Sequence, residues 1–247
     1  MITLYDAGPT LYSDKTLGFS PFVKMIIFTL RYKNLPYKII EVGYDEIEST
    51  AKSIGAPPTR SKPDGSPKYT LPIIQDSTTG KVVSDSFKIA VYLDQTYPDT
   101  PKVVPDGTLV LQSVFADTLF KHYVYPVFLA SRQVINTLLG EETLAAQLRI
   151  LGDEFVNPKL SPEEEKQEWG KVEASFEFLG KAYGEQKGPF VMGGDKPTFA
   201  DFVVAGFLVF LRETYGKDSE KWKEVSGWAG GRVGALCSEV LLKCGLA

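Results

Sequence analysis

Residues 70–97 read TLPIIQDSTTGKVVSDSFKIAVYLDQTY, and this stretch decides the predicted fold. Two apolar runs, 70–76 and 81–84, flank a short polar turn that ends at Gly80, which is the pattern of an antiparallel hairpin. Residues 85–97 then carry apolar side chains at helical spacing. The stretch therefore predicts two strands of one sheet and a helix that follows them.

The residues before this hairpin predict a strand, a helix and a second strand. The sequences ITLYD (2–6) and YKIIEV (37–42) are typical of strands, and the apolar run over 20–33 is typical of a buried helix between them. A crossover helix makes the two strands that it joins parallel. With a weak helical patch and a polar loop before residue 70, the element order is β-α-β-α-β-β-α, which predicts a small mixed sheet.

The second half of the chain has a different character. Residues 98–106 carry three prolines and no apolar period, so they are predicted to link a domain over 1–97 to a domain over 107–247. Every apolar pattern after this linker has helical spacing, which predicts an all-helical domain. Within it, Ser161 with Glu164 and Thr198 with Asp201 have the spacing of capping boxes that begin two helices.

Composition excludes several classes of partner. The 247 residues carry a net charge of −4 with scattered basic residues, which argues against nucleic acid and anionic membranes. The longest apolar run, 202–211, is about half of what spans a bilayer, so a cytoplasmic protein is expected. Cys237 and Cys244 are too few for a disulfide framework or a four-ligand zinc site, so we expect two reduced thiols and no metal.

Ser20 begins the first predicted helix, directly before Pro21. A serine at this position commonly caps the helix, and this alternative stays open on the residues alone. A ligand-binding role is favoured by the preceding loop, 7–19, which is longer than the usual connection of about 2 to 6 residues between a strand and a helix. Asp85 and Ser86 make a second polar helix start. Two such starts on one sheet suit a zwitterionic, peptide-like ligand with an anionic end.

These features together resemble a glutathione transferase over essentially the whole chain. They are the element order, the proline that opens the strand TLPII, the Asp85-Ser86 pair, the proline-rich linker and the TFAD helix cap. FSPFVKMIIFTL, VVSDSFKIAVYLDQTYPD and MGGDKPTFADF resemble the bacterial glutathione-dependent β-etherases and a related fungal serine-type class, of which the fungal class is the nearer. The resemblance implies an α/β plus all-α protein. A thioredoxin-like N-terminal domain with a mixed four-stranded sheet would precede a helical-bundle C-terminal domain.

The resemblance also implies glutathione as co-substrate and a role for individual residues. Ser20 would be the catalytic serine, whose hydroxyl donates a hydrogen bond to the glutathione sulfur. A cis-proline at Pro72 would leave the backbone of Leu71 to pair with the cysteinyl part, while Asp85 would face the γ-glutamyl ammonium and Ser86 the carboxylate. The glutathione-binding residues implied in this way are Phe22, Arg60, Thr70, Leu71, Pro72, Asp85 and Ser86.

A basic residue for the glycyl carboxylate of glutathione is expected in or just before the loop 54–70. Lys52, Arg60, Lys62 and Lys68 are all candidates in this part of the chain. Arg60 is preferred, because a guanidinium forms two parallel hydrogen bonds with a carboxylate.

The electrophile is expected to bind between the long loop and the first helix of the second domain. One helical face of that helix carries Leu111, Phe115, Leu119 and His122, and Tyr12 and Phe19 would close the other side of the pocket. Simple core packing is the alternative for the aromatic residues. His122, the only histidine, has acid-base catalysis as one interpretation and the commoner role of a hydrogen-bonded packing residue as the other.

The function predicted from these residues is detoxification by a homodimeric, serine-type glutathione transferase. Its substrates would be hydrophobic aromatic or phenolic electrophiles, such as wood-derived compounds, with ether cleavage as one possible reaction. A ligandin-type protein that sequesters polyphenols with little turnover is the competing hypothesis, because a large aromatic pocket serves storage as well as turnover. A non-catalytic scaffold would leave Asp85 and Ser86 without a role.

Overall fold

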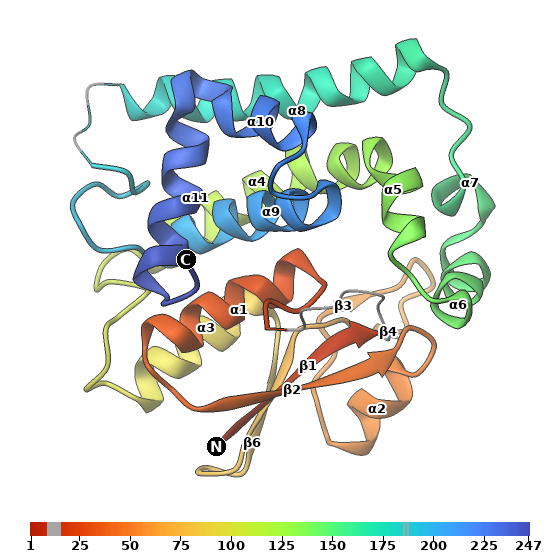
Figure 1. Cartoon of the computed structure of the whole chain (residues 1–247). Coiled ribbons are helices and arrows are strands. Elements are labelled where there is room, and N and C mark those ends of the chain that lie inside the picture. Colours follow the sequence, from red (N-terminus) through yellow and green to blue (C-terminus); the bar gives the residue numbers. More distant parts are fainter. Residues whose placement is uncertain (9–15, 185, 187) are drawn as a thin grey trace.

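The computed structural model describes residues 1–8, 16–184, 186 and 188–247 (Figure 1). Its N-terminal half contains a four-stranded sheet in the order β2-β1-β5-β6. The parallel pair is β1 with β2, whereas β5 runs antiparallel to both β1 and β6. The strands are β1 (Ile2–Gly8), β2 (Tyr37–Gly43), β5 (Ile73–Asp76) and β6 (Lys81–Ser84). The mixed sheet and the hairpin predicted from residues 70–97 are thereby confirmed.

The two faces of the sheet are covered by different helices, because successive side chains of a strand point to opposite faces. Leu4 and Ile74 belong to the large core that includes α1 (Pro21–Tyr32) and α3 (Ser86–Thr96). Tyr5 and Ile73 belong instead to a small core with Ala51 of α2 (Ile47–Ser53). The face with α1 and α3 is the one that meets the helical half.

The polar loop predicted before residue 70 contains a feature that the sequence pattern did not indicate. It holds a small hairpin of β3 (Arg60–Ser61) and β4 (Pro67–Lys68), in which Arg60 lies opposite Lys68. Asp64 shapes the turn by accepting hydrogen bonds from the backbone N–H and the hydroxyl of Ser66, at 2.9 and 2.7 Å. Strands of two residues are too short to produce a readable alternation of apolar and polar positions.

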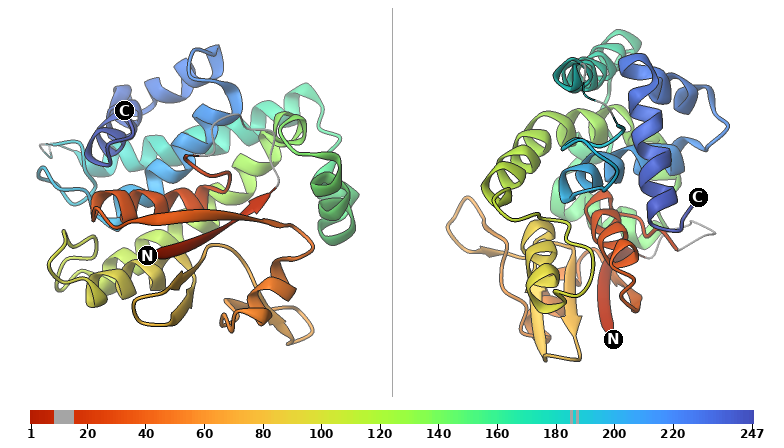
Figure 2. Two further views of the ribbon diagram at one scale, coloured as in Figure 1. Left: turned by 60° about the horizontal axis from the view of Figure 1, so that its bottom comes forward. Right: turned by 90° about the vertical axis from the view of Figure 1, so that its left-hand side faces the viewer.

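The second half of the chain is helical. Its helices are α4 (Leu109–Ala130), α5 (Arg132–Thr137), α6 (Glu141–Leu151), α7 (Asp153–Val156), α8 (Pro162–Tyr183), α9 (Phe199–Tyr215), α10 (Glu220–Gly227) and α11 (Arg232–Lys243), with a 3₁₀ turn at Trp228–Gly231. Both views of Figure 2 place α9 between α8 and α1, and nearly all of its side chains are buried. No helix within the described ranges has both the length and the apolar character needed to cross a bilayer.

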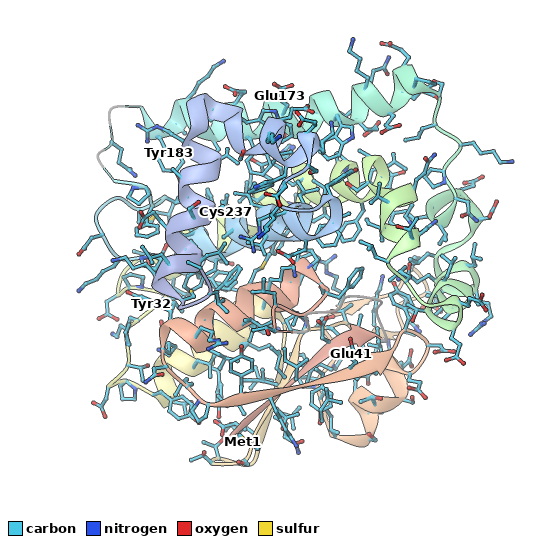
Figure 3. The ribbon with its side chains drawn as sticks, viewed as in Figure 1. Met1, Tyr32, Glu41, Glu173, Tyr183 and Cys237 are labelled. Carbon is cyan, nitrogen blue, oxygen red and sulfur yellow. The ribbon has the colours of Figure 1, made fainter. Side chains whose placement is uncertain are left out.

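The predicted caps and thiols are found in this half. Glu164 accepts hydrogen bonds from both the backbone N–H and the hydroxyl of Ser161, each at 2.8 Å. Asp201 accepts the equivalent pair from Thr198, at 2.7 and 2.9 Å. The capping boxes are therefore confirmed. Cys237, on α11, and Cys244 are both free and buried, and Cys237 lies among the helices (Figure 3).

The two halves meet along α1 and α9. The Phe22 ring packs on Phe207 and the Phe28 ring on Phe202, with centroids 5.7 and 6.0 Å apart. Gly206 allows the close approach, because a Cβ atom there would lie 2.7 Å from the carbonyl oxygen of Pro21. The start of α1 is thereby fixed against the centre of the helical half.

The proline-rich segment between the halves is also held in place. Lys33, at the end of α1, forms a buried ion pair of 2.7 Å with Asp94 of α3. The Asp94 carboxylate also accepts hydrogen bonds from the backbone N–H groups of Val103 and Val104. Removal of one partner from a buried pair of this kind is costly, so this pair ties α1, α3 and the connecting segment together.

Candidate active site

A cleft of about 430 Å³ opens at the N-terminus of α1. It lies at the edge of the sheet where β1 ends, which is the edge where α/β sheets commonly bind ligands. Its walls come from the end of β1, the start of α1, the region of α2, the β3–β4 hairpin with the segment after it, and the end of α6. The lining residues are Ala7, Ser20, Tyr44, Asp45, Ile47, Glu48, Lys62, Lys68, Tyr69, Thr70, Leu71, Ile150 and Leu151.

Ser20 occupies the N-cap position of α1, but its hydroxyl forms no capping bond. The third residue of the helix is Val23, which has no carboxylate with which to complete a capping box. The side chain is half-buried and lines the cleft. Among the described residues, the Ser20 hydroxyl therefore lies at a helix start without serving the helix.

The backbone of Ser20 is held from below by Asp6 of β1. The Asp6 carboxylate accepts hydrogen bonds from the backbone N–H groups of Phe19, at 2.5 Å, and of Ser20, at 3.3 Å. Burial raises the pKa of Asp6 to about 6, although these bonds and the nearby Lys24 ammonium oppose the shift. At neutral pH this carboxylate is thus mostly ionised.

Lys24 holds the same loop through its carbonyl groups. Its ammonium donates to the backbone oxygens of Leu17, at 3.3 Å, and Gly18, at 2.8 Å. Asp6 and Lys24 are both almost completely buried. Neither residue was singled out from the sequence, although a lysine inside the apolar run FVKMIIF was a signal that could have found Lys24.

The segment that opens β5 forms the opposite wall. The Leu71–Pro72 peptide bond is cis, as the resemblance implied, and Thr70 and Leu71 line the cleft. Ile73 pairs with Ser84 in the sheet, so residues 71–72 and 85–86 extend from neighbouring strands side by side. The segment from β6 to α3 therefore lies next to the cleft, although its residues are not part of the lining.

Asp85 and Ser86 begin α3 at this place. One carboxylate oxygen of Asp85 accepts hydrogen bonds from the backbone N–H groups of Phe87 and Lys88, both at 3.1 Å. Asp85 has a φ of 81°, which is unusual for a residue with a side chain, and Ser86 is buried. Asp85 is thus a helix cap in the structure, and strained backbone of this kind is concentrated at functional sites.

The two basic residues that line the cleft do not include Arg60, which was preferred from the sequence. Arg60 is exposed on β3 and does not line the cleft, whereas Lys62 and Lys68 do. Lys62 is paired with Glu48 at 3.1 Å. The hairpin places Lys68 at the mouth of the cleft, and this position could not be read from a loop with four basic candidates.

The residues predicted for the electrophile pocket are not brought together with Ser20. Phe115, Leu119 and His122 line a separate cavity of about 470 Å³ between α4 and α8, which shares no lining residue with the Ser20 cleft. Leu111 is 57% exposed. The cavity is separate from the Ser20 cleft because a different face of α4 packs toward α1. That face carries Phe120, whose ring centroid lies 5.1 Å from that of Phe22.

The aromatic residues near the long loop also have other surroundings than expected. Phe19 is buried and packs edge-to-face on Phe210, with centroids 5.9 Å apart. Phe22 points into the contact between α1 and the helical half. Tyr12 lies outside the described residues. The apolar residues of the Ser20 cleft include Ile150 and Leu151, at the end of α6, which the sequence did not indicate.

Comparison with known proteins identifies the family. The family model described as "Glutathione S-transferase, N-terminal domain" matches residues 19–96, and the one described as "Glutathione S-transferase, C-terminal domain" matches residues 110–241. This chain belongs to the glutathione S-transferase family. The transferase has the expected fold, with a thioredoxin-like N-terminal domain followed by a helical C-terminal domain.

Fungal proteins are among the relatives of this transferase. The glutathione S-transferase-like protein ustS of Aspergillus flavus is 29% identical, with 89% of this chain and 82% of that protein covered. The crystal structure of CsGST63524 of Ceriporiopsis subvermispora, in complex with glutathione, is similar with a TM-score of 0.84 and 32% identity, covering 98% of this chain and 97% of that one. GSTFuA3 of Phanerochaete chrysosporium has the same TM-score and identity, with 98% and 96% covered.

Proposed function

We propose that this transferase is of the serine type and that the Ser20 hydroxyl donates a hydrogen bond to the sulfur of glutathione. The observation that carries this proposal is the unused hydroxyl at the start of α1, inside the cleft. Ser161 and Thr198 also stand at helix starts, but each of their hydroxyls donates a hydrogen bond to a neighbouring carboxylate. Ser20 alone of these three leaves its hydroxyl for a ligand.

A hydroxyl at a helix start is suited to stabilise a thiolate. A free thiol has a pKa of about 8.5 and is mostly protonated near neutrality. The positive end of the helix dipole and a hydrogen-bond donor both favour the anion, so the pKa of the bound thiol falls. The thiolate is the nucleophile that attacks the electrophile.

The remaining contacts of glutathione are proposed from the residues around the cleft. The backbone of Leu71 pairs with the cysteinyl part, and the pair Asp85 and Ser86 holds the γ-glutamyl end. Only one oxygen of Asp85 caps α3, so the other is left for the ammonium. We assign the glycyl carboxylate to Lys68, because Arg60 lies outside the cleft and Lys62 is already paired with Glu48. The similar CsGST63524, which was solved with glutathione, supports this co-substrate.

The electrophile is proposed to be aromatic or phenolic and to bind against the end of α6. Ile150 and Leu151 are apolar and line the same cleft as Ser20, together with Tyr44. Arg149 of α6 forms an ion pair of 2.8 Å with Asp45, which holds this end of α6 against the turn after β2. An apolar wall opposite the sulfur favours a hydrophobic electrophile over a charged one.

Ultraviolet titration of the thiolate of bound glutathione tests this function, with Ser161→Ala as the matched control. We expect Ser20→Ala to raise the pKa of the bound thiol by about one unit and to lower kcat roughly tenfold. Ser161→Ala removes a hydroxyl from an exposed helix start far along the chain, so it should cost about 1 kcal/mol of stability and leave the thiol unchanged. Equal thiol pKa values in wild type and Ser20→Ala would refute the serine mechanism.

A ligandin-type protein is the second candidate, and the cavity between α4 and α8 favours it. This cavity is separate from the Ser20 cleft and mainly apolar, with Phe115 and Phe178 in its lining. Tight binding of several polyphenols, without glutathione-dependent turnover of any aromatic electrophile, would support sequestration over catalysis.

We also propose a homodimer, because exposed apolar side chains gather on α4 and α8: Leu109, Val110, Leu111, Val114 and Phe178.

A further inference from the structure

The start of α1 differs from the two capping-box starts, at Ser161 and Thr198, in where its capping carboxylate comes from. At Ser161 and Thr198 the carboxylate that accepts the N-cap backbone N–H is the third residue of the same helix. At Ser20 the equivalent N–H donates to Asp6, fourteen residues earlier in the chain. The helix start is thus completed by a carboxylate from the neighbouring strand.

Because the capping carboxylate comes from β1 and not from α1 itself, the Ser20 hydroxyl is left without the partner that a capping box supplies. In the two capping boxes, the same carboxylate oxygen that holds the backbone N–H also accepts the Ser161 or Thr198 hydroxyl. Asp6 reaches the backbone of Ser20 but forms no bond with its hydroxyl, and its oxygens are engaged by the N–H groups of Ala7, Phe19 and Ser20. The capping requirement of the backbone is met while the side chain is left unused.

We propose that Asp6 is a positioning residue for the transferase reaction, which holds the Ser20 backbone from beneath the cleft and so keeps the Ser20 hydroxyl available to the glutathione sulfur. This inference rests on the proposed serine mechanism.

Lys24 and Gly18 also fix the loop that precedes Ser20. Lys24 donates hydrogen bonds to the carbonyl groups of Leu17 and Gly18. The segment before Ser20 is therefore held through both its N–H and its C=O groups. Gly18 has a φ of 63°, and a Cβ atom there would lie 2.5 Å from a carboxylate oxygen of Asp6. The loop is therefore fitted closely around this carboxylate, which fixes Ser20 more firmly than a surface loop would.

The test compares Asp6→Asn with Asp201→Asn. Asp201 is an equally buried carboxylate that binds backbone N–H groups at the start of α9, outside the cleft lining. Both substitutions replace one of the two acceptor oxygens of a carboxylate with an NH₂ group, which cannot accept a hydrogen bond. Both should therefore lower the thermal stability. We expect only Asp6→Asn to shift the pKa of bound glutathione toward the Ser20→Ala value and to lower kcat roughly tenfold, with little change in the KM for glutathione.

Combination with Ser20→Ala separates this inference from the proposed function. If Asp6 acts through Ser20, Asp6→Asn should cause no further loss of kcat in a Ser20→Ala background, because the two effects are not additive. A normal thiol pKa in folded Asp6→Asn, beside a shifted one in Ser20→Ala, would overturn the positioning role alone. No shift in Ser20→Ala would overturn the serine mechanism itself.

A second variant keeps the proposal testable if Asp6→Asn does not fold. Gly18→Ala would place a methyl group 2.5 Å from the Asp6 carboxylate, which is too close, so the carboxylate must shift although Asp6 and Ser20 themselves are not substituted. We expect it to raise the pKa of the bound thiol in the same direction as Ser20→Ala. A folded Gly18→Ala protein with wild-type thiol pKa and kcat would count against the role of this carboxylate.

Discussion

Lys68 and Arg60 lie opposite each other on one small hairpin, yet only Lys68 reaches the cleft. Among the described residues, no carboxylate forms an ion pair with Lys68. We predict that Lys68→Met weakens glutathione binding by about 1.5 to 3 kcal/mol, the usual contribution of a hydrogen bond to a charged group. Arg60→Met is the control and should bind like wild type, as measured by calorimetry.

An analogue of glutathione with an amidated glycyl end identifies the group that Lys68 recognises. Wild type and Lys68→Met should bind this analogue with similar affinity, because the carboxylate that distinguishes them is gone. If Arg60→Met weakens glutathione binding and Lys68→Met does not, then the arginine first preferred from the sequence holds the carboxylate.

At the level of residues, the sequence indicated those candidate site positions that carry a local signal. Ser20 before Pro21 and the polar pair after β6 stand out because helix starts favour such residues. Asp6 could not be assigned in this way, because the groups that it holds at the start of α1 are the backbone N–H groups of Phe19 and Ser20, which lie more than ten residues away. A contact of that kind depends on how the loop folds over the strand, and no spacing in the sequence encodes it.

At the level of elements, the close contact between α1 and α9 positions the cleft. We predict that Gly206→Ala lowers the stability by about 1 to 3 kcal/mol, the usual cost of overpacking, because its Cβ atom would lie 2.7 Å from the Pro21 carbonyl oxygen. Pro21 follows Ser20 directly, so kcat should fall as well. Thermal unfolding and steady-state kinetics measure both effects.

Gly170 of α8 is the matched control for this prediction. It is exposed, and an added Cβ atom would meet nothing within 4 Å. Gly170→Ala should therefore raise the stability by up to about 1 kcal/mol through helix propensity and leave kcat unchanged. Loss of activity in both variants would show that the effect is not specific to the contact between α1 and α9.

Long elements with strong periodicity were predictable, whereas short ones were not. The sheet, α1, α3 and the caps of α8 and α9 follow from apolar spacing and from polar residues at helix starts. The β3–β4 hairpin and the short helices α5 and α7 have too few residues to show a period, and α6 was covered only by the general prediction of a helical second half. Lys68 of that hairpin and Ile150 of α6 both line the cleft, so its outer walls could not be derived from the sequence.

At the level of the whole molecule, two buried carboxylates make the free energy of unfolding depend on pH. Burial raises the pKa of Asp6 and of Asp201 from 3.8 to about 6. The folded protein therefore binds protons at these sites more tightly than the unfolded chain does. Their contribution to stability is full below about pH 4 and is lost as the pH rises through about 6.

Asp201→Asn tests this linkage, because an amide has no proton to lose over this range. Each raised pKa corresponds to about 3 kcal/mol of stability that is lost between about pH 4 and pH 6. We predict that the loss in this window, measured by denaturant unfolding at several pH values, is smaller in Asp201→Asn than in wild type by up to that amount. Asp218→Asn, which changes an exposed carboxylate, should keep the wild-type slope. An unchanged slope in Asp201→Asn would mean that the cap of α9 stays ionised throughout, held by its hydrogen bonds to Val191 and Thr198 in spite of burial.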